Sequence, residues 1–329
     1  MFNSSFAREM TDYLELRTAV LSPSSASNDR RVLLLLDQYL VLSGFQGKEL
    51  TEDILSAWSK TLSGKSKTVK EKLAVVRGFG KYLNTLGHQS FLPTLPKVKS
   101  DYIPYIFSDE EIVSIFHYAD NLTPQNPRSC SSFFQLKIPM ALRILYSCGT
   151  RLQETMSLQR KDVDFKNRTL FLKKTKFSKE RVIPVHESLI AVMERYCLTL
   201  GIMHEPEAFL FPGRKEGSHY TTRQMDSWFS EILKLADIDQ RERDCHERGA
   251  CLHCFRHLFV LKSMQQLEAA GHSVDMNDLL LPTYLGHECL LDTDKYMRFS
   301  GGQVAGAIEA FESFTSGLIP DVEVPYEEE

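Results

Sequence analysis

The chain has 329 residues, of which 43% are hydrophobic and 25% are charged, the composition of a water-soluble globular protein long enough for two domains. Its most apolar run, residues 32–42, is interrupted by Asp37 and Gln38, which argues against a membrane span. Its seven cysteines are scattered, which argues against a scaffold held by disulfides and favours the cytoplasm. The formal charge of −4 at pH 7 argues against a chain that is basic over its whole surface, so any basic face must be local.

The first third of the chain is predicted to be helical. Apolar residues recur at helical spacing from Phe6 to Leu21, and we expect the Ser-Pro-Ser-Ser segment that begins at Ser22 to end this first helix. Three further helices are expected over residues 28–43, 51–62 and 66–86. The helix at 51–62 should be capped by the hydroxyl group of Thr51.

The last of these helices has a basic face beside its apolar face, so it could lie along DNA. A solvated surface is the simpler explanation of such charges when the helix is taken alone. Prolines at 93, 96 and 104 predict an extended linker over residues 89–104, which makes residues 1–88 a helical domain. The candidate DNA contacts on this domain are Lys65, Lys67, Lys70 and Arg77.

The second predicted domain, residues 105–300, combines helices with a small sheet. A capping-box pattern at Ser108 and Glu111 predicts a helix over 109–119. Short β-branched and aromatic segments predict three antiparallel strands. The expected fold class is therefore mainly α, with a small antiparallel β-sheet in the C-terminal domain. Further helices are expected over 132–148, 186–200, 221–236 and 253–270, strands over 163–165, 169–172 and 181–185, and one helix, 303–316, within the C-terminal segment 301–329.

Basic residues are concentrated around the predicted sheet. Between Arg143 and Arg181 the chain has eleven lysines and arginines against four acids, whereas seven acids and no basic residue follow Arg298. Four lysines on one turn repel each other unless an anion is near, so the turn between the second and third strands is interpreted as a phosphate contact. A solubilising loop is the alternative. The lysines of this turn are Lys173, Lys174, Lys176 and Lys179.

A set of residues that are far apart in the sequence supplies the groups needed to stabilise a phosphate under attack. Arg151 and Arg256 can hold its nonbridging oxygens, and His287 can donate a hydrogen bond to it. Glu154 follows Arg151 by three residues, so both lie on one helix face and can pair. Each pair alone is more often structural than functional, and the combination is what indicates a site.

The same set contains the groups that would carry out a transesterification. Tyr296, nine residues beyond His287, can attack the phosphorus with its hydroxyl group. Lys176 can protonate the departing 5′ oxygen, and His253 can accept the tyrosine proton. A phosphotyrosyl link would conserve the free energy of the phosphodiester, so this chemistry requires no cofactor, no metal and no ATP.

In this order, the motifs resemble those of the tyrosine recombinases, which include phage integrases, Xer proteins and transposon integrases. The resemblance places the family's six catalytic residues on this chain: its first arginine on Arg151, its lysine on Lys176, its His-x-x-Arg motif on His253 and Arg256, its last histidine on His287 and its nucleophile on Tyr296. The run Lys179-Glu180-Arg181 before the third strand sets the register of the lysine. One departure is Arg256-His257-Leu258-Phe259-Val260, where the family commonly has Arg-His-Thr-Phe-Ala.

The resemblance also implies an architecture and partners. The helical domain would correspond to the family's core-binding domain and residues from about 105 onward to its catalytic domain. The implied activity is DNA integration by a site-specific recombinase, often one of a mobile element. The implied partners are double-stranded DNA recombination sites and three further copies of the chain, in a homotetramer that exchanges C-terminal helices, and the implied location is the nucleoid.

Three alternatives stay open. A type IB topoisomerase would use similar residues to relax supercoils, and a catalytically idle DNA-binding regulator could share the scaffold. The apolar C-terminal helix favours a recombinase over a topoisomerase. The complete set of six catalytic residues argues against a catalytically idle regulator. A zinc site is the third alternative, but the spacing is not that of two Cys-x-x-Cys pairs, so no metal is predicted. Its potential ligands are Cys245, His246, Cys251 and Cys254.

Overall fold

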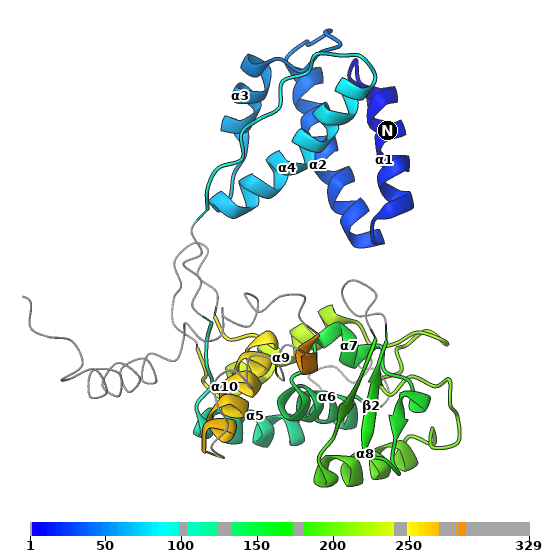
Figure 1. Ribbon diagram of the computed structural model, residues 1–329. Helices are drawn as coiled ribbons and strands as arrows, with labels where there is room; N and C mark the ends of the chain where they lie inside the picture. Colours follow the sequence, from blue (N-terminus) through cyan, green and yellow to red (C-terminus); the bar gives the residue numbers. More distant parts are fainter. Residues whose placement is uncertain are drawn as a thin grey trace, which may run out of the picture. The chain divides into compact units, whose positions relative to one another are not determined.

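The computed structural model describes residues 2–98, 104–123, 133–173, 180–239, 249–269, 281 and 283–286. It divides into two compact units, Met1–Asp101 and Tyr102–Glu329, and each has its own hydrophobic core. The described elements are mainly helices, with one three-stranded antiparallel sheet in the second unit, which confirms the predicted fold class (Figure 1). Across the described residues, no helix is both long and apolar enough to cross a membrane.

The first unit is built from helices whose apolar faces meet in a single core. Helices α1, α2 and α4 pack against one another, and α3 contributes Leu55 and Trp58 to the same core. Thr51 caps α3 as predicted, because its hydroxyl accepts the backbone N–H of Ile54 at 3.4 Å. The bounds are α1 (Ala7–Val20), α2 (Pro23–Leu42), α3 (Glu52–Thr61) and α4 (Ser66–Thr85).

Helix α2 begins at Pro23, five residues earlier than expected from the sequence. The segment that was expected only to end α1 also starts α2. The hydroxyl of Ser22 accepts the backbone N–H of Ser25 at 3.3 Å, which satisfies one of the free amides of the first turn. Pro23 occupies the first helical position, where a missing N–H costs no helical hydrogen bond. The proline is therefore a start signal.

The chain that follows α4 stays attached to the first unit. The backbone N–H of Phe91 donates to the carbonyl of Leu50 at 2.7 Å, and the Arg77 guanidinium donates to the carbonyl of Pro93 at 2.8 Å. Phe91 and Leu95 also pack against the core of this unit. The first residues of the predicted linker are therefore held by the helices.

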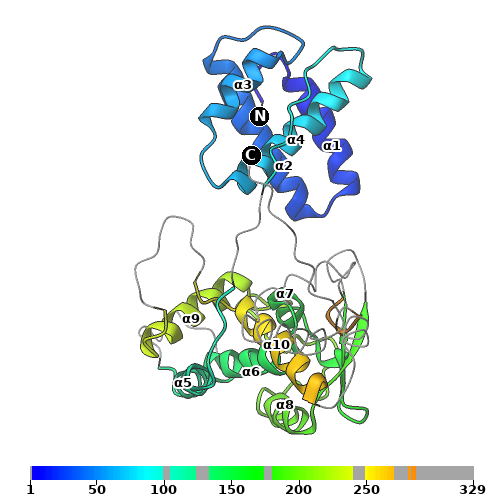
Figure 2. The ribbon, with the colours of Figure 1, turned by 60° about the vertical axis from the view of Figure 1, so that its left-hand side comes forward.

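The second unit is organised around helix α6, which is apolar on nearly all sides. It packs against α5, α8 and α10, and these helices lie around it in both views (Figures 1 and 2). Ser108 and Glu111 form the predicted capping box at the start of α5. The bounds are α5 (Asp109–Asp120), α6 (Phe134–Cys148), α8 (Glu187–Thr199), α9 (Thr222–Leu235) and α10 (His253–Ala269).

The sheet has the order β1-β2-β3, with both pairs antiparallel. Leu170, Leu172 and Ile183 are buried in the core of the unit, which fixes the register. Arg181 is the first residue of β3 and lies opposite Leu172 on β2. The strands are β1 (Val163–Asp164), β2 (Thr169–Leu172) and β3 (Arg181–Pro184), and the short 3-10 helix η1 (Arg160–Asp162) precedes them.

A sharp turn at Gly149 joins α6 to the short helix α7 (Leu152–Met156). Gly149 has φ +55, in the left-handed region that glycine adopts most readily. It is also tightly enclosed, because a Cβ at this position would lie 2.4 Å from Cδ1 of Phe259 on α10. Both the backbone conformation and the neighbouring ring therefore require glycine, and the turn brings Arg151 to the end of α6.

We predict that Gly149→Ala lowers the free energy of unfolding by about 2 kcal/mol or more, because left-handed strain and a ring clash add together. Chemical denaturation would measure the loss. Gly201→Ala is the matched control: Gly201 follows α8 with φ +72 and has no atom within 4 Å of the place that an alanine methyl group would take, so it should lose only about 1 kcal/mol. Equal losses in the two variants would contradict the importance of the Phe259 contact.

Candidate active site

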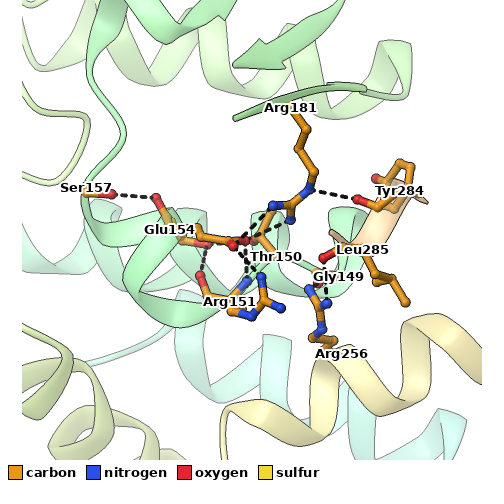
Figure 3. A network of polar contacts seen from close by, with 10 residues as sticks. Gly149, Thr150, Arg151, Glu154, Ser157, Arg181, Arg256, Tyr284 and Leu285 are labelled. Atoms are coloured by element: carbon orange, nitrogen blue, oxygen red, sulfur yellow. Dashed lines mark hydrogen bonds and ion pairs between the residues drawn. The ribbon is translucent and has the colours of Figure 1, made fainter. Parts of the chain in front are cut away.

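Arg151 and Glu154 form the ion pair that their spacing predicts. Nη1 of Arg151 donates to Oε1 of Glu154 at 2.7 Å, and the backbone N–H of Arg151 donates to Oε2 at 3.0 Å (Figure 3). The Glu154 residue is only 5% exposed, whereas 26% of the Arg151 side chain is exposed. The carboxylate therefore fixes the arginine from the protein side and leaves part of its guanidinium accessible.

Arg181 also binds Glu154, although it is not among the site residues predicted from the sequence. Nη1 and Nη2 of Arg181 donate to the two carboxylate oxygens at 3.2 and 2.9 Å, and Nε donates to the carbonyl of Tyr284 at 2.8 Å (Figure 3). Its side chain is 12% exposed. No local pattern in the sequence identifies it, because its two partners are 27 and 103 residues away and the burial of Glu154, which calls for a second cation, is visible only in the structure.

The electrostatics of Glu154 reflect this pairing. Burial on its own would raise the pKa of Glu154, but the hydrogen bonds from Arg181 and from the backbone and side chain of Arg151 outweigh it and hold the pKa below its usual value. The carboxylate is therefore charged at neutral pH, and both guanidinium groups keep an anionic partner.

Arg256 connects the end of α6 to the Leu-Gly-His segment. Its Nη1 donates to the carbonyl of Gly149 and its Nη2 to the carbonyl of Leu285, both at 2.8 Å (Figure 3). The residue is 1% exposed. These bonds hold the segment before Arg151 and the segment before His287 on one guanidinium. Arg151, Glu154 and Arg256, all predicted site residues, are thus brought together from α7 and α10.

The described part of the Leu-Gly-His segment is a turn that packs against α10. Leu285 is buried with Val260 and Met264, and the ring of Tyr284 stacks on Phe259 with centroids 5.4 Å apart. Gly286 has φ +66, and a Cβ there would lie 3.1 Å from Nη1 of Arg181. The glycine of the motif is therefore explained by its left-handed backbone and by the arginine beside it.

His253 is the first residue of α10 and is exposed, three positions before Arg256. Its ring meets the ring of His257 edge to face, with centroids 4.8 Å apart. Burial, together with the nearby charges of His253 and Arg256, lowers the pKa of His257 to about 3. His257 is therefore uncharged at neutral pH, and its neutral ring lies against His253, the predicted base.

Several predicted residues lie outside the described residues: the catalytic candidates Lys176, His287 and Tyr296, and the DNA-contact candidates Lys174 and Lys179. Of the other candidate DNA contacts, Lys65 and Lys67 are exposed and Lys70 is half-buried at the start of α4. Lys173 forms an ion pair with the buried carboxylate of Asp162. Nη1 of Arg77 donates to the carbonyls of Leu92 and Pro93 in its own unit, so this nitrogen is used within the protein.

The thiols of Cys251 and Cys254 lie at the start of α10, with their sulfur atoms 3.6 Å apart. Cys245 and His246, the other two ligands of the alternative zinc site, are outside the described residues. Within the described ranges, no three potential metal ligands are grouped around a common point. The zinc site therefore stays a hypothesis, because two of its four potential ligands lie outside the described residues.

We predict that Glu154→Gln lowers the free energy of unfolding by about 2 kcal/mol at pH 7, because two guanidinium groups lose their anionic partner. The depressed pKa of Glu154 gives the sign: its stabilisation is complete above the unfolded value near 4.5 and is lost as the pH falls through the folded value. The difference in free energy of unfolding between the variant and the unaltered chain should therefore become smaller in acid. Glu187→Gln, which removes an exposed ion pair with Arg168, is the control and should change little.

Comparison with known proteins gives a consistent assignment. A model of the phage integrase family matches residues 106–299. Tyrosine recombinase XerC of Staphylococcus saprophyticus is 28% identical over 276 residues, which cover 83% of this chain and 83% of XerC.

Two solved structures share the fold. The XerH site-specific recombinase bound to a palindromic difH substrate superposes with a TM-score of 0.66 at 19% identity, over 88% of this chain and 80% of XerH. The Tn1549 transposon integrase, in complex with a circular intermediate DNA, superposes with a TM-score of 0.63 at 17% identity, over 89% of this chain and 95% of the integrase. Because the family match covers more than half of the sequence and the fold agrees with it, the chain belongs to the phage integrase family, the tyrosine recombinases.

Proposed function

We propose that this recombinase cleaves and rejoins double-stranded DNA at specific sites through a 3′-phosphotyrosyl intermediate, without metal or ATP. The observation that carries the proposal is the junction at Arg256, whose guanidinium binds both the Gly149 carbonyl and the Leu285 carbonyl. Two residues after Gly149 comes Arg151, and two residues after Leu285 comes His287. Groups suited to binding one phosphate are therefore linked through a single side chain.

In the proposed reaction, the hydroxyl oxygen of Tyr296 attacks the scissile phosphorus and the bond from phosphorus to the 5′ oxygen breaks. The tyrosine proton passes to His253, and the departing 5′ oxygen takes a proton from Lys176, so charges and atoms balance. Attack by the 5′ hydroxyl of another strand on the phosphotyrosyl bond reverses the step and exchanges strands. No external energy source is required, because one phosphodiester replaces another.

The positive groups would stabilise the charge that grows on the nonbridging oxygens. Arg151 suits direct contact, since its planar guanidinium is fixed by Glu154 and remains partly exposed. His287 would donate to the same phosphate. Arg256 is enclosed, and its guanidinium binds two backbone carbonyls. It would add positive potential to the site and hold the two segments that lead to Arg151 and His287.

The partners follow from the same proposal. The substrate would be a pair of DNA recombination sites held by four copies of the chain, with the C-terminal helix of each copy docked on a neighbour, and work on such sites would place the protein at the nucleoid. The XerH and Tn1549 integrase structures, both in complex with DNA, support DNA as the substrate. The second unit would supply the catalytic groups, and the helical first unit would add contacts with the duplex.

We predict that the full chain forms a covalent 3′ adduct on a nicked suicide duplex and that Tyr296→Phe abolishes it. The duplex would carry a binding site selected from random-sequence DNA with the purified protein, and the adduct would be measured on denaturing gels. Tyr284→Phe is the control: burial raises the pKa of Tyr284 and its ring stacks on Phe259, so its hydroxyl is a poor nucleophile and the variant should still form the adduct.

The outcomes separate the alternatives. An adduct that persists in Tyr296→Phe would overturn the assignment of the nucleophile. Specific binding with no adduct in the unaltered chain would indicate the catalytically idle regulator. An adduct accompanied by relaxation of supercoiled plasmid, with no joining of two sites, would indicate an activity like that of a type IB topoisomerase.

A further inference from the structure

Arg181, like Arg256, contacts two segments that lead to proposed phosphate-binding residues, but it does so through the Glu154 carboxylate on one side and the Tyr284 carbonyl on the other. Its Nη atoms bind both oxygens of Glu154, which in turn binds Arg151. Its Nε binds the carbonyl of Tyr284, three residues before His287. One planar guanidinium thus uses two edges, one for a carboxylate and one for a backbone carbonyl, a combination that the single ammonium group of lysine cannot reproduce.

The contact with Glu154 matters because that carboxylate is buried. With Arg181 present, two cations compensate the buried charge. Without it, Arg151 would be the sole counterion, and the carboxylate would lose the donors that fix its own position and, through it, the position of Arg151. Loss of Arg181 should therefore change the orientation of Arg151 even though the two arginines need not touch.

The contact with Tyr284 fixes the other side of the site. The turn at 284–286 is held by Arg181 at the Tyr284 carbonyl and by Arg256 at the Leu285 carbonyl, each at 2.8 Å. Gly286 leaves room for the Arg181 guanidinium, which a side chain at that position would crowd. Two arginines from different elements, β3 and α10, therefore determine the position from which the chain continues to His287.

We infer that Arg181 is a positioning residue for strand cleavage, acting through Glu154 on Arg151 and through the Tyr284 carbonyl on the turn that leads to His287. The inference rests on the proposed function, since it concerns the rate of the same reaction. The Arg181 side chain is largely buried and its nitrogens already bind Glu154 and the Tyr284 carbonyl, so we expect it to act without touching the phosphate or the leaving group. Its loss should slow cleavage of bound DNA without weakening the binding of DNA.

The test compares Arg181→Met, which keeps bulk but removes charge and donors, with Arg181→Lys, which keeps the charge alone. The matched control is Arg168→Met, because Arg168 lies just before β2 in an exposed ion pair with Glu187. Single-turnover cleavage of the nicked duplex should fall about 100-fold in Arg181→Met and remain well below normal in Arg181→Lys, as expected for a misplaced catalytic group. The dissociation constant for DNA should stay within about threefold, and the control should match the unaltered chain.

A modified substrate separates positioning from general damage. A methylphosphonate at the scissile position removes the negative charge that Arg151 would neutralise, so it should reduce the cleavage defects of Arg181→Met and Arg151→Ala alike. A partly unfolded variant would show the same defect on both substrates. If a 5′-bridging thiolate leaving group restored the rate and the methylphosphonate did not, the residue would act on the leaving group and the inference would be overturned.

The pH profile provides a second readout. The charged groups that contact the Glu154 carboxylate in the described structure are Arg151 and Arg181. Without Arg181, burial would raise the pKa of Glu154 against weaker opposition, so its carboxyl group would gain a proton as the pH falls and release Arg151. Cleavage by Arg181→Met should therefore decline more steeply in mild acid than cleavage by the unaltered chain.

Failure of this inference and failure of the proposed function give different results. No Tyr296-dependent adduct with the unaltered chain would contradict the proposed function. A normal adduct with the unaltered chain, formed at the same rate by Arg181→Met, would leave that function intact and overturn the positioning role. Loss of DNA affinity in parallel with the rate would likewise overturn it, since it would make Arg181 a binding residue.

Discussion

The site depends on one buried negative charge. A carboxylate removed from water is costly unless cations and hydrogen-bond donors surround it, and Glu154 receives both from Arg151 and Arg181. This requirement joins elements that are distant in sequence: α7 supplies the acid, β3 supplies one arginine, and the same arginine extends to the turn at 284–286. The buried carboxylate holds the guanidinium groups around it in fixed orientations. Without such an anion, neighbouring arginines would repel each other and move apart.

The fold provides this arrangement by placing one apolar helix at the centre of the second unit. Because α6 is buried on nearly all sides, its C-terminal end is fixed, and the turn at Gly149 delivers Arg151 from a rigid base. Helix α10 packs along α6 and contributes Phe259 above the glycine and Arg256 to its carbonyl. Hydrophobic packing therefore determines where the polar groups lie, and the hydrogen bonds determine their orientation.

Local signals in the sequence were sufficient for much of this structure. The caps at Thr51 and Ser108, the three strands and the pair formed by Arg151 and Glu154 depend on neighbours in the chain, and they were predicted correctly. The start of α2 was predicted wrongly, because a proline after a serine can end one helix and begin the next. Arg181 had no local signal of its role, since its partners are 27 and 103 residues away. Arg77 likewise donates to the carbonyls of residues 92 and 93, a tertiary contact that the pattern of charges in the sequence does not reveal.

The attachment of residues 91–95 to the first unit sets the length of the tether between the units. The chain leaves the first core at Leu95 and enters the second core at Tyr105. About ten residues therefore connect them, and covalent geometry limits their reach to roughly 35 Å. A tether this short gives each unit a high effective concentration near the other, so under the proposed function binding of a duplex by one unit would make binding by the second almost an intramolecular step. The proposed contacts of the two units with DNA, each modest alone, would then add together, as a chain with a net negative charge requires in order to hold a polyanion.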